Sequence, residues 1–281
     1  TLFPYTTLFR SNADFRAEDV VATGDRFGTA LRLNGADGEI VRGTFRDFST
    51  ALDVEGDGAR VEDVRLIAND RALDLSSLNA RVVGAELIGN EDGIYAPDQG
   101  ARIEDSLFRD HTDRALDLGD GTVATGNRFL FNAEAVVADG AEIRDNRFVA
   151  NTAAVAAGRD GAVVANRFTA DGTAVEIRGG RDGARVANNL VVGADVAVVV
   201  DGGTGDVVEN NTFRQPDGTA VELRGGARDT ALWSNIFDLA AGIAVDVAGD
   251  SREGLASDHN LFSPRGTADV ARLAGADLAD L

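Results

Sequence analysis

The chain has 281 residues, a net charge of −20 and a pI of about 4.4, and its positive charge comes entirely from arginine. So acidic a chain argues against nucleic acid or an anionic membrane as the partner, because phosphate binding needs basic patches. Cysteine and methionine are absent, which excludes disulfides, thiol catalysis and soft-ligand sites for Cu(I) or iron–sulfur clusters.

The first eleven residues, TLFPYTTLFRS, differ from the rest of the chain. No basic segment precedes the apolar residues and no small-residue cleavage site follows them, so they do not form a secretory signal peptide. They are also much shorter than the roughly 20 apolar residues of a membrane-spanning helix. We interpret residues 1–11 as a non-native leader encoded by a sequencing adapter. The alternative is a cap on the first turn of the repeat that follows.

From residue 12 to residue 264 the chain repeats with a period of about 21 residues. Each repeat consists of a glycine, a short apolar strand, a polar turn and a second strand with alternating apolar residues. Both halves are short β-type runs, which argues against a leucine-rich repeat with its helix or 3₁₀ turn. Clear repeats begin at Gly38, Gly58, Asn79, Gly100, Gly121, Gly140, Gly161, Gly183 and Gly205.

Two columns of residues recur once per repeat. The first is apolar and predicts a stacked core: Phe27, Phe45, Leu66, Leu87, Phe108, Phe129, Phe148, Phe168, Leu190, Phe213, Phe237 and Phe262. The second lies two residues earlier and consists of Asn127, Asn146, Asn166, Asn188, Asn211, Asn235 and Asn260. Asparagine tolerates left-handed backbone geometry, and stacked amides can hydrogen-bond one another, so this column predicts a polar ladder.

The G-x-x-V-x-x-N-x-F…A-V-x-V unit, together with the run SNIFDLAAGIAVDV…SDHNLFSP, resembles the repeats of the pectate-lyase-like superfamily. The resemblance covers about nine-tenths of the chain. It implies an all-β fold, a single-stranded right-handed parallel β-helix (solenoid) of about eleven coils with strands about 4.8 Å apart. Pectate-lyase-like chemistry would need an arginine base and calcium-binding carboxylates. The N-T-D, D-D, G-H-G, R-I-K and D-P-H-D signatures are absent, and so is lysine, so the resemblance assigns no catalytic residue.

Residues 265–281 follow the last repeat and carry apolar residues at helical spacing. These are Val270, Leu273, Leu278 and Leu281. Thr267 or Asp269 can cap a helix that begins there. The sequence therefore predicts a short C-terminal segment that is helical and truncated.

The middle residue of each second strand should point outward, because side chains alternate along a strand. The resulting column is Arg32, Asp53, Asp74, Tyr95, Asp117, Val137, Ala156, Glu176, Val199, Glu222 and Asp246. Calcium is the one cofactor that the carboxylates suggest, with Asp74, Asp92, Asp113 and Asp117 as candidate ligands, although Ca²⁺ prefers six to eight oxygens. The alternative is a solvated acidic face.

The polar turn before that strand, and the strand itself, carry the candidate catalytic residues His111, Asp92, Asp113, Arg114 and Tyr95. Asp92 and Asp113 are one repeat apart, so we expect them to be stacked neighbours. A histidine beside carboxylates has a raised pKa and can act as an acid or a base. Paired carboxylates can share acid and base work on a glycosidic bond. The alternative is a surface turn of Asp–Arg pairs, each worth under about 1 kcal/mol.

Arginine recurs between the asparagine and phenylalanine columns at Arg128, Arg147 and Arg167, with Arg65 further back. A uronate chain can lie across such a column, because guanidinium binds carboxylate in a bidentate manner. The alternative is solvated pairing with Asp145 and neighbouring acids.

Together these features predict an extracellular or periplasmic monomer that acts on or binds polysaccharide, with no nucleic acid partner and no membrane insertion. The sequence leaves open whether the protein is an enzyme. If it is one, a polyuronate lyase or epimerase ranks above a hydrolase. The alternative is a non-catalytic β-helix, either a surface adhesin or a carbohydrate-binding module. Copper-delivery β-helix proteins share the repeat, but this chain offers no Met or Cys ligand.

Overall fold

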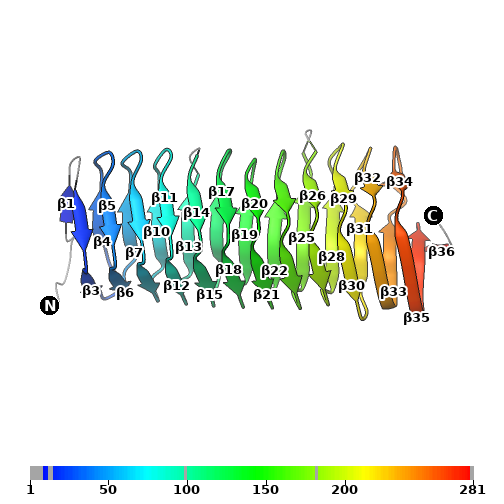
Figure 1. The fold of residues 1–281 in the computed structure, drawn as a ribbon, viewed down its shortest axis with the longest axis horizontal. Coiled ribbons are helices and arrows are strands. Elements are labelled where there is room, and N and C mark those ends of the chain that lie inside the picture. Colours follow the sequence, from blue (N-terminus) through cyan, green and yellow to red (C-terminus); the bar gives the residue numbers. More distant parts are fainter. Residues whose placement is uncertain (1–8, 12–14, 98–99, 181–182, 279–281) are drawn as a thin grey trace. The chain divides into compact units, whose positions relative to one another are not determined.

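The computed structural model describes residues 9–11, 15–97, 100–180 and 183–278. The chain divides into two compact units, unit 1 (residues 1–137) and unit 2 (residues 138–281). Every regular element in the described residues is a β-strand, and no helix there could span a membrane. Each unit is a parallel β-helix in which one turn contributes three short strands, and each strand pairs with its counterpart in the next turn (Figure 1). This is the fold type of the pectate-lyase-like proteins, and the turns of both units together number about twelve, where the sequence predicts about eleven.

In unit 1 the strands form three parallel faces. The first face contains β2 (Arg16–Glu18), β5 (Glu39–Val41), β8 (Arg60–Glu62), β11 (Arg81–Val83), β14 (Arg102–Glu104) and β17 (Val123–Thr125). The second contains β3 (Val21–Thr23), β6 (Thr44–Arg46), β9 (Arg65–Ile67), β12 (Glu86–Ile88), β15 (Leu107–Arg109) and β18 (Arg128–Leu130). The third contains β1 (Phe9–Ser11), β4 (Thr29–Leu33), β7 (Thr50–Val54), β10 (Arg71–Leu75), β13 (Asp92–Ala96) and β16 (Arg114–Leu118). Strand β19 (Glu134–Ala138) crosses the division between the units.

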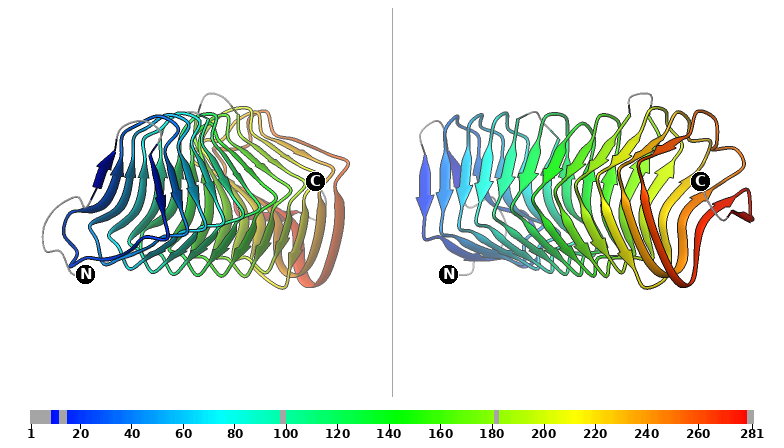
Figure 2. Two further views of the ribbon diagram at one scale, coloured as in Figure 1. Left: turned by 60° about the vertical axis from the view of Figure 1, so that its left-hand side comes forward. Right: turned by 45° about the vertical axis from the view of Figure 1, so that its right-hand side comes forward.

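Unit 2 repeats the three faces, and Figure 2 shows its strands from two further sides. The first face contains β20 (Glu142–Arg144), β23 (Ala162–Val164), β26 (Arg185–Ala187), β29 (Val207–Glu209), β32 (Ala231–Trp233) and β34 (Ala256–Asp258). The second begins with β21 (Arg147–Val149), β24 (Arg167–Thr169), β27 (Leu190–Val192) and β30 (Thr212–Gln215). The third begins with β22 (Ala153–Ala157), β25 (Thr173–Arg178), β28 (Val196–Asp201) and β31 (Thr219–Arg224). Two long strands, β33 (Ile236–Val247) and β35 (Leu261–Leu273), continue both of these faces.

The predicted apolar column forms the core, with two corrections. Phe148 and Phe168 stack with ring centroids 4.7 Å apart, and Phe237 lies 4.9 Å from Phe262. The assignment of Phe27 and Leu190 to this column is wrong. Phe27 is 66% exposed, and Leu190 is the first residue of β27, where it pairs with Thr212. Their places are taken by Ala22, in register with Phe45, and by Val191, in register with Phe213. Alternation along a three-residue strand buries only the middle residue, which neither Phe27 nor Leu190 is.

The asparagine ladder exists, and its fourth member also shifts by one residue. Asn189 accepts hydrogen bonds from the backbone N–H (2.8 Å) and the amide (3.2 Å) of Asn166, and its own amide donates to Asn211 (3.0 Å). The expected member, Asn188, is exposed and has a positive φ of 57°. Two consecutive asparagines leave the ladder position ambiguous in the sequence, and the register of β27 decides it.

A second polar ladder, which was not predicted from the sequence, lies three residues after each core residue. In unit 1 it contains Asn69, Asn90, His111 and Asn132, and in unit 2 Asn151 and Asp171. Asn90, Asn132 and Asp171 accept the backbone N–H of the rung before them, at 2.9, 3.1 and 2.8 Å. These rungs hold the turn that leads into the third face.

Both ends of the chain depart from the simple repeat. Residues 1–8 of the expected leader lie outside the described residues, and Phe9–Ser11 forms β1, which pairs with β4. The helix expected within residues 265–281 is wrong: residues to Leu273 belong to β35, and β36 (Ala276–Leu278) pairs with it in antiparallel fashion. The exposed edge of β33 offers backbone hydrogen bonds along the whole segment, whereas a helix this short is marginal on its own.

Candidate functional site

The third face of unit 1 carries the candidate site. Its strands β10, β13 and β16 read RALDL, DGIYA and RALDL, with apolar residues turned inward. The register places Asp74, Tyr95 and Asp117 side by side at the outward position, as the sequence predicts. The same pairing puts Arg71 next to Asp92 at the start of the strands.

A hollow of about 340 Å³ lies over these strands. It is lined by Arg71, Asp92, Ile94, Tyr95, Asp113, Arg114 and Asp117. Four of the five residues predicted as catalytic, and three of the four predicted calcium ligands, therefore line one hollow. Asp74 lies beside the hollow, where it accepts a hydrogen bond from Arg71.

Arginine–carboxylate pairs organise the hollow. Arg71 Nη1 donates to Asp74 Oδ2 at 2.9 Å, and Arg71 Nη2 lies 3.5 Å from Asp92 Oδ2. The same guanidinium lies 5.1 Å from the centre of the Tyr95 ring, within cation–π range. Arg114 Nη1 donates to Asp117 Oδ2 at 2.8 Å, so the two outward acids, Asp74 and Asp117, each have an arginine partner on their own strand.

These pairs keep both arginines protonated. Burial, which lowers the pKa of Arg71, is outweighed by its hydrogen bond to Asp74 and by the charges of Asp74 and Asp92, so its pKa is raised. The hydrogen bond to Asp117, and then the charges of Asp117, Glu134 and Asp113, raise the pKa of Arg114 against the effect of burial. Neither guanidinium is prepared to act as a base, which requires a lowered pKa.

Asp92 and Asp113 share the hollow but are not level neighbours. Ile94 pairs with Leu116, 22 residues later, so Arg114 rather than Asp113 comes level with Asp92. The turn from Phe108 to Leu116 is one residue longer than the turn from Leu87 to Ile94, which produces this shift. The extra residue brings an arginine, rather than a second acid, level with Asp92.

His111 is not part of the hollow. Its side chain is 2% exposed, its backbone N–H donates to Asn132 Oδ1 at 3.1 Å, and its ring lies 6.3 Å from that of Phe108. Both ring nitrogens are buried, and neither has a hydrogen bond of acceptable geometry, although the carbonyls of Leu87 and Asn90 are near. Burial lowers the pKa of His111 to about 4, so the expected raised pKa is wrong. The sequence signal that identifies this role is the asparagine at the same place in neighbouring repeats.

Three of the four acids expected to bind calcium are paired with arginine. Asp74, Asp92 and Asp117 each lie within 3.5 Å of an arginine nitrogen. In the part of the chain that the structure describes, no three His, Cys, Asp or Glu side chains gather as metal ligands.

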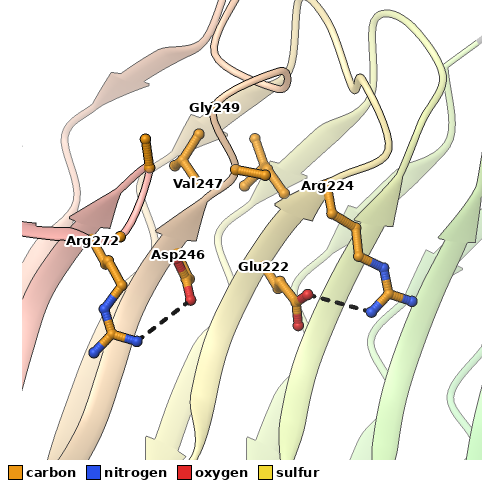
Figure 3. Close-up of a pocket in the computed structure, with 10 residues that line it drawn as sticks. Glu222, Arg224, Asp246, Val247, Gly249 and Arg272 are labelled. Carbon is orange, nitrogen blue, oxygen red and sulfur yellow. Dashed lines mark hydrogen bonds and ion pairs between the residues drawn. The ribbon is translucent and has the colours of Figure 1, made fainter.

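A second hollow, of about 430 Å³, lies over the third face of unit 2 (Figure 3). Asp246 and Glu222 lie side by side there in register, between Arg272 and Arg224. Arg224 is held by Asp201 (2.9 Å), Glu222 (3.3 Å) and Glu176 (3.3 Å). The charged side chains of this second hollow therefore form ion pairs with one another.

Comparison with known proteins identifies the fold. No protein-family model matches the chain, and no curated protein matches it by sequence. The surface protein and adhesin PfbA of Streptococcus pneumoniae shares 8% identity over 92% of this chain and 90% of its own, with a TM-score of 0.54. The A-module of the mannuronan C-5 epimerase AlgE6 of Azotobacter vinelandii shares 14% identity over 94% and 79%, with a TM-score of 0.45. An alginate lyase from Paenibacillus sp. str. FPU-7 shares 15% identity over 95% and 90%, with a TM-score of 0.39. The PfbA similarity, with a TM-score above 0.5 and 8% identity, establishes a common fold and nothing more.

Proposed function

We propose that this protein binds polysaccharide in the hollow of unit 1. The observation that carries the proposal is the gathering of Asp92, Asp113, Asp117, Arg71 and Arg114 around one open concavity with Tyr95. Each sugar hydroxyl can donate one hydrogen bond and accept others, and this lining offers both partners, because carboxylates accept and guanidiniums donate. Arg71, Arg114, Asp92 and Asp117 are held in place by prior pairing, which lowers the entropy cost of binding.

The charge of the lining favours neutral sugars. Three carboxylates and two guanidiniums line the hollow, and Asp74 adds a further carboxylate beside it. A uronate would bring a negative charge next to this excess of acid. A neutral sugar instead exchanges hydrogen bonds with both kinds of group at no such cost.

We infer binding without turnover. An arginine base is disfavoured, because the pKa values of Arg71 and Arg114 are raised, and His111 lies in the buried ladder. A polyuronate lyase or epimerase would depend on Tyr95, on Asp113, or on a carboxylate already paired with arginine. The proposal therefore favours a carbohydrate-binding or adhesive β-helix, and the PfbA fold, found in a protein named as a surface adhesin, supports a cell-surface or extracellular location.

The test uses the full chain and immobilised dextran, xylan and galactomannan. Asp92→Asn and Arg114→Gln should each weaken binding about tenfold, the effect of losing a hydrogen bond to a charged group. Asp25→Asn, which changes an exposed acid of the same unit outside the hollow, should bind like the parent. Binding to none of these glycans, or equal binding by all variants, would exclude the hollow as the site.

A parallel incubation separates binding from chain cleavage. Alginate, polygalacturonate and the neutral glycans are incubated with the full chain, in calcium and in EDTA, and analysed by mass spectrometry. We expect intact chains in every sample. Unsaturated or shortened products that disappear with Asp92→Asn would instead establish an enzyme at this hollow.

A further inference from the structure

Two exposed arginines of unit 2, Arg147 and Arg167, lie directly side by side on its second face. Strands β21 and β24 pair in register, with Arg147 opposite Arg167 and Phe148 opposite Phe168. The phenylalanine rings stack in the core, 4.7 Å apart, so the arginines at the strand ends point to solvent. Strands of one face are about 4.8 Å apart, which brings two like charges close together.

No acid in the described part of the chain compensates this arginine pair, as we call Arg147 and Arg167. Neither side chain makes a hydrogen bond or ion pair with a described residue. Asp145, the partner suggested by the sequence, is bonded to Arg144 instead, at 3.1 Å. Asp171, four residues after Arg167, is buried and accepts hydrogen bonds from the backbone N–H groups of Asn151 and Thr169.

Elsewhere in unit 2 arginines on the strands are neutralised locally. Arg185 pairs with Glu209 at 2.6 Å, and Arg224 with Asp201 at 2.9 Å. Within unit 2, the other strand-end residues of β21, β24 and β27 are uncharged: Val149, Thr169, Leu190 and Val192. A chain of net charge −20 thus leaves two adjacent cations without a described acidic partner.

We propose that the arginine pair binds the carboxylates of an acidic polysaccharide that lies across β21 and β24. Guanidinium groups bind carboxylates through two parallel hydrogen bonds, and a uronic acid polymer supplies such groups at regular intervals. The inference rests on the proposed function in taking a polysaccharide as the ligand. It assigns the acidic class to a surface separate from the unit 1 hollow, whose excess of acid favours neutral sugars.

The experiment measures binding of the full chain to immobilised polygalacturonate and to dextran. Arg147→Gln combined with Arg167→Gln should weaken polygalacturonate binding by about tenfold or more, because two charge-assisted contacts are lost. Arg252→Gln removes a charge from another exposed arginine of unit 2 with no described partner and should have little effect. Circular dichroism of each variant should match the parent, since both altered side chains are exposed.

A gain of affinity provides a test that misfolding cannot imitate. Leu190 follows Arg167 in the same register position, so Leu190→Arg extends the pair to three adjacent arginines. This variant should bind polygalacturonate several-fold more tightly than the parent. Three results would each overturn the proposal. The parent does not bind polygalacturonate, the double variant binds it as tightly as the parent, or Arg252→Gln loses as much affinity as the double variant.

The two binding proposals fail separately. Loss of polygalacturonate binding in the arginine variants, with no binding of dextran, xylan or galactomannan by the parent, would uphold the arginine pair and reject the hollow. Neutral-glycan binding that depends on Asp92, with no effect of the arginine variants on polygalacturonate, would do the reverse.

Discussion

Position 111 carries a histidine where the neighbouring turns carry asparagine. An asparagine there supplies an oxygen that accepts the N–H of the previous rung and an amide that donates to the carbonyl 24 residues back, as Asn90 does to Leu66 at 3.0 Å. Imidazole cannot supply both at once with this geometry, and both ring nitrogens stay without a bond. His111 is therefore a weak rung rather than a reactive group.

This assignment predicts a pH dependence of unit 1. The pKa of His111 is about 4 in the folded state and near 6.5 when unfolded, so the unfolded chain binds the proton first as pH falls. Stability should decline from about pH 6.5 to about pH 4, by roughly 3 kcal/mol from this group, and level off below. In His111→Asn that contribution should vanish, and stability at pH 7 should rise by about 1 kcal/mol.

Hydrogen exchange of peptides from β15 and β16 measures this opening free energy in the full chain. His259→Asn is the control, because His259 is an exposed residue of unit 2. If the opening free energy differs between pH 7 and pH 4.5 by the same amount in His111→Asn as in the parent, burial of the ring does not set the acid sensitivity.

At the scale of elements, the ladders fix the register between successive turns. A strand of three residues buries one side chain, so apolar burial alone specifies the register of the strand weakly. A buried asparagine specifies it more strongly, because its amide must hydrogen-bond with the turns on both sides. Asn189→Ala leaves the N–H of Asn166 and the carbonyl of Val163 without partners and should cost about 3 kcal/mol. Asn188→Ala changes an exposed residue next to it and should cost under about 1 kcal/mol.

Thermal and denaturant unfolding followed by Trp233, the single tryptophan, reports on unit 2 for both variants. Equal losses for Asn188→Ala and Asn189→Ala would contradict the assignment of Asn189 to the ladder.

The elements also show what the sequence can specify. The 21-residue period predicts the strands, the core column and the outward column of Asp74, Tyr95 and Asp117, because a solenoid converts period directly into stacking. One-residue changes within turns are not visible in that period. The longer turn before β16 moved Arg114 level with Asp92, and consecutive asparagines hid the true rung at Asn189.

At the scale of the whole molecule, the fold follows from the repeat while the site follows from side-chain pairing. The sequence predicted that Asp92, Asp113, Arg114 and Tyr95 would gather, and they do line one hollow. Histidine itself is compatible with both a wet turn and a ladder rung, so only the asparagines at the same place in neighbouring repeats indicate that His111 is buried. The sequence could not predict which acid pairs with each arginine, because so acidic a chain offers several acids near every guanidinium.

The most direct test of the binding site is carboxyl footprinting of the full chain. A carbodiimide and glycine ethyl ester label accessible carboxylates, and mass spectrometry compares the free protein with a sample saturated with whichever of dextran, xylan or galactomannan it binds. The account predicts reduced labelling of Asp92, Asp113 and Asp117 in the bound sample, with Asp25 unchanged. Unchanged labelling of these three residues in a protein that demonstrably binds glycan, or protection of Glu222 and Asp246 instead, would contradict it.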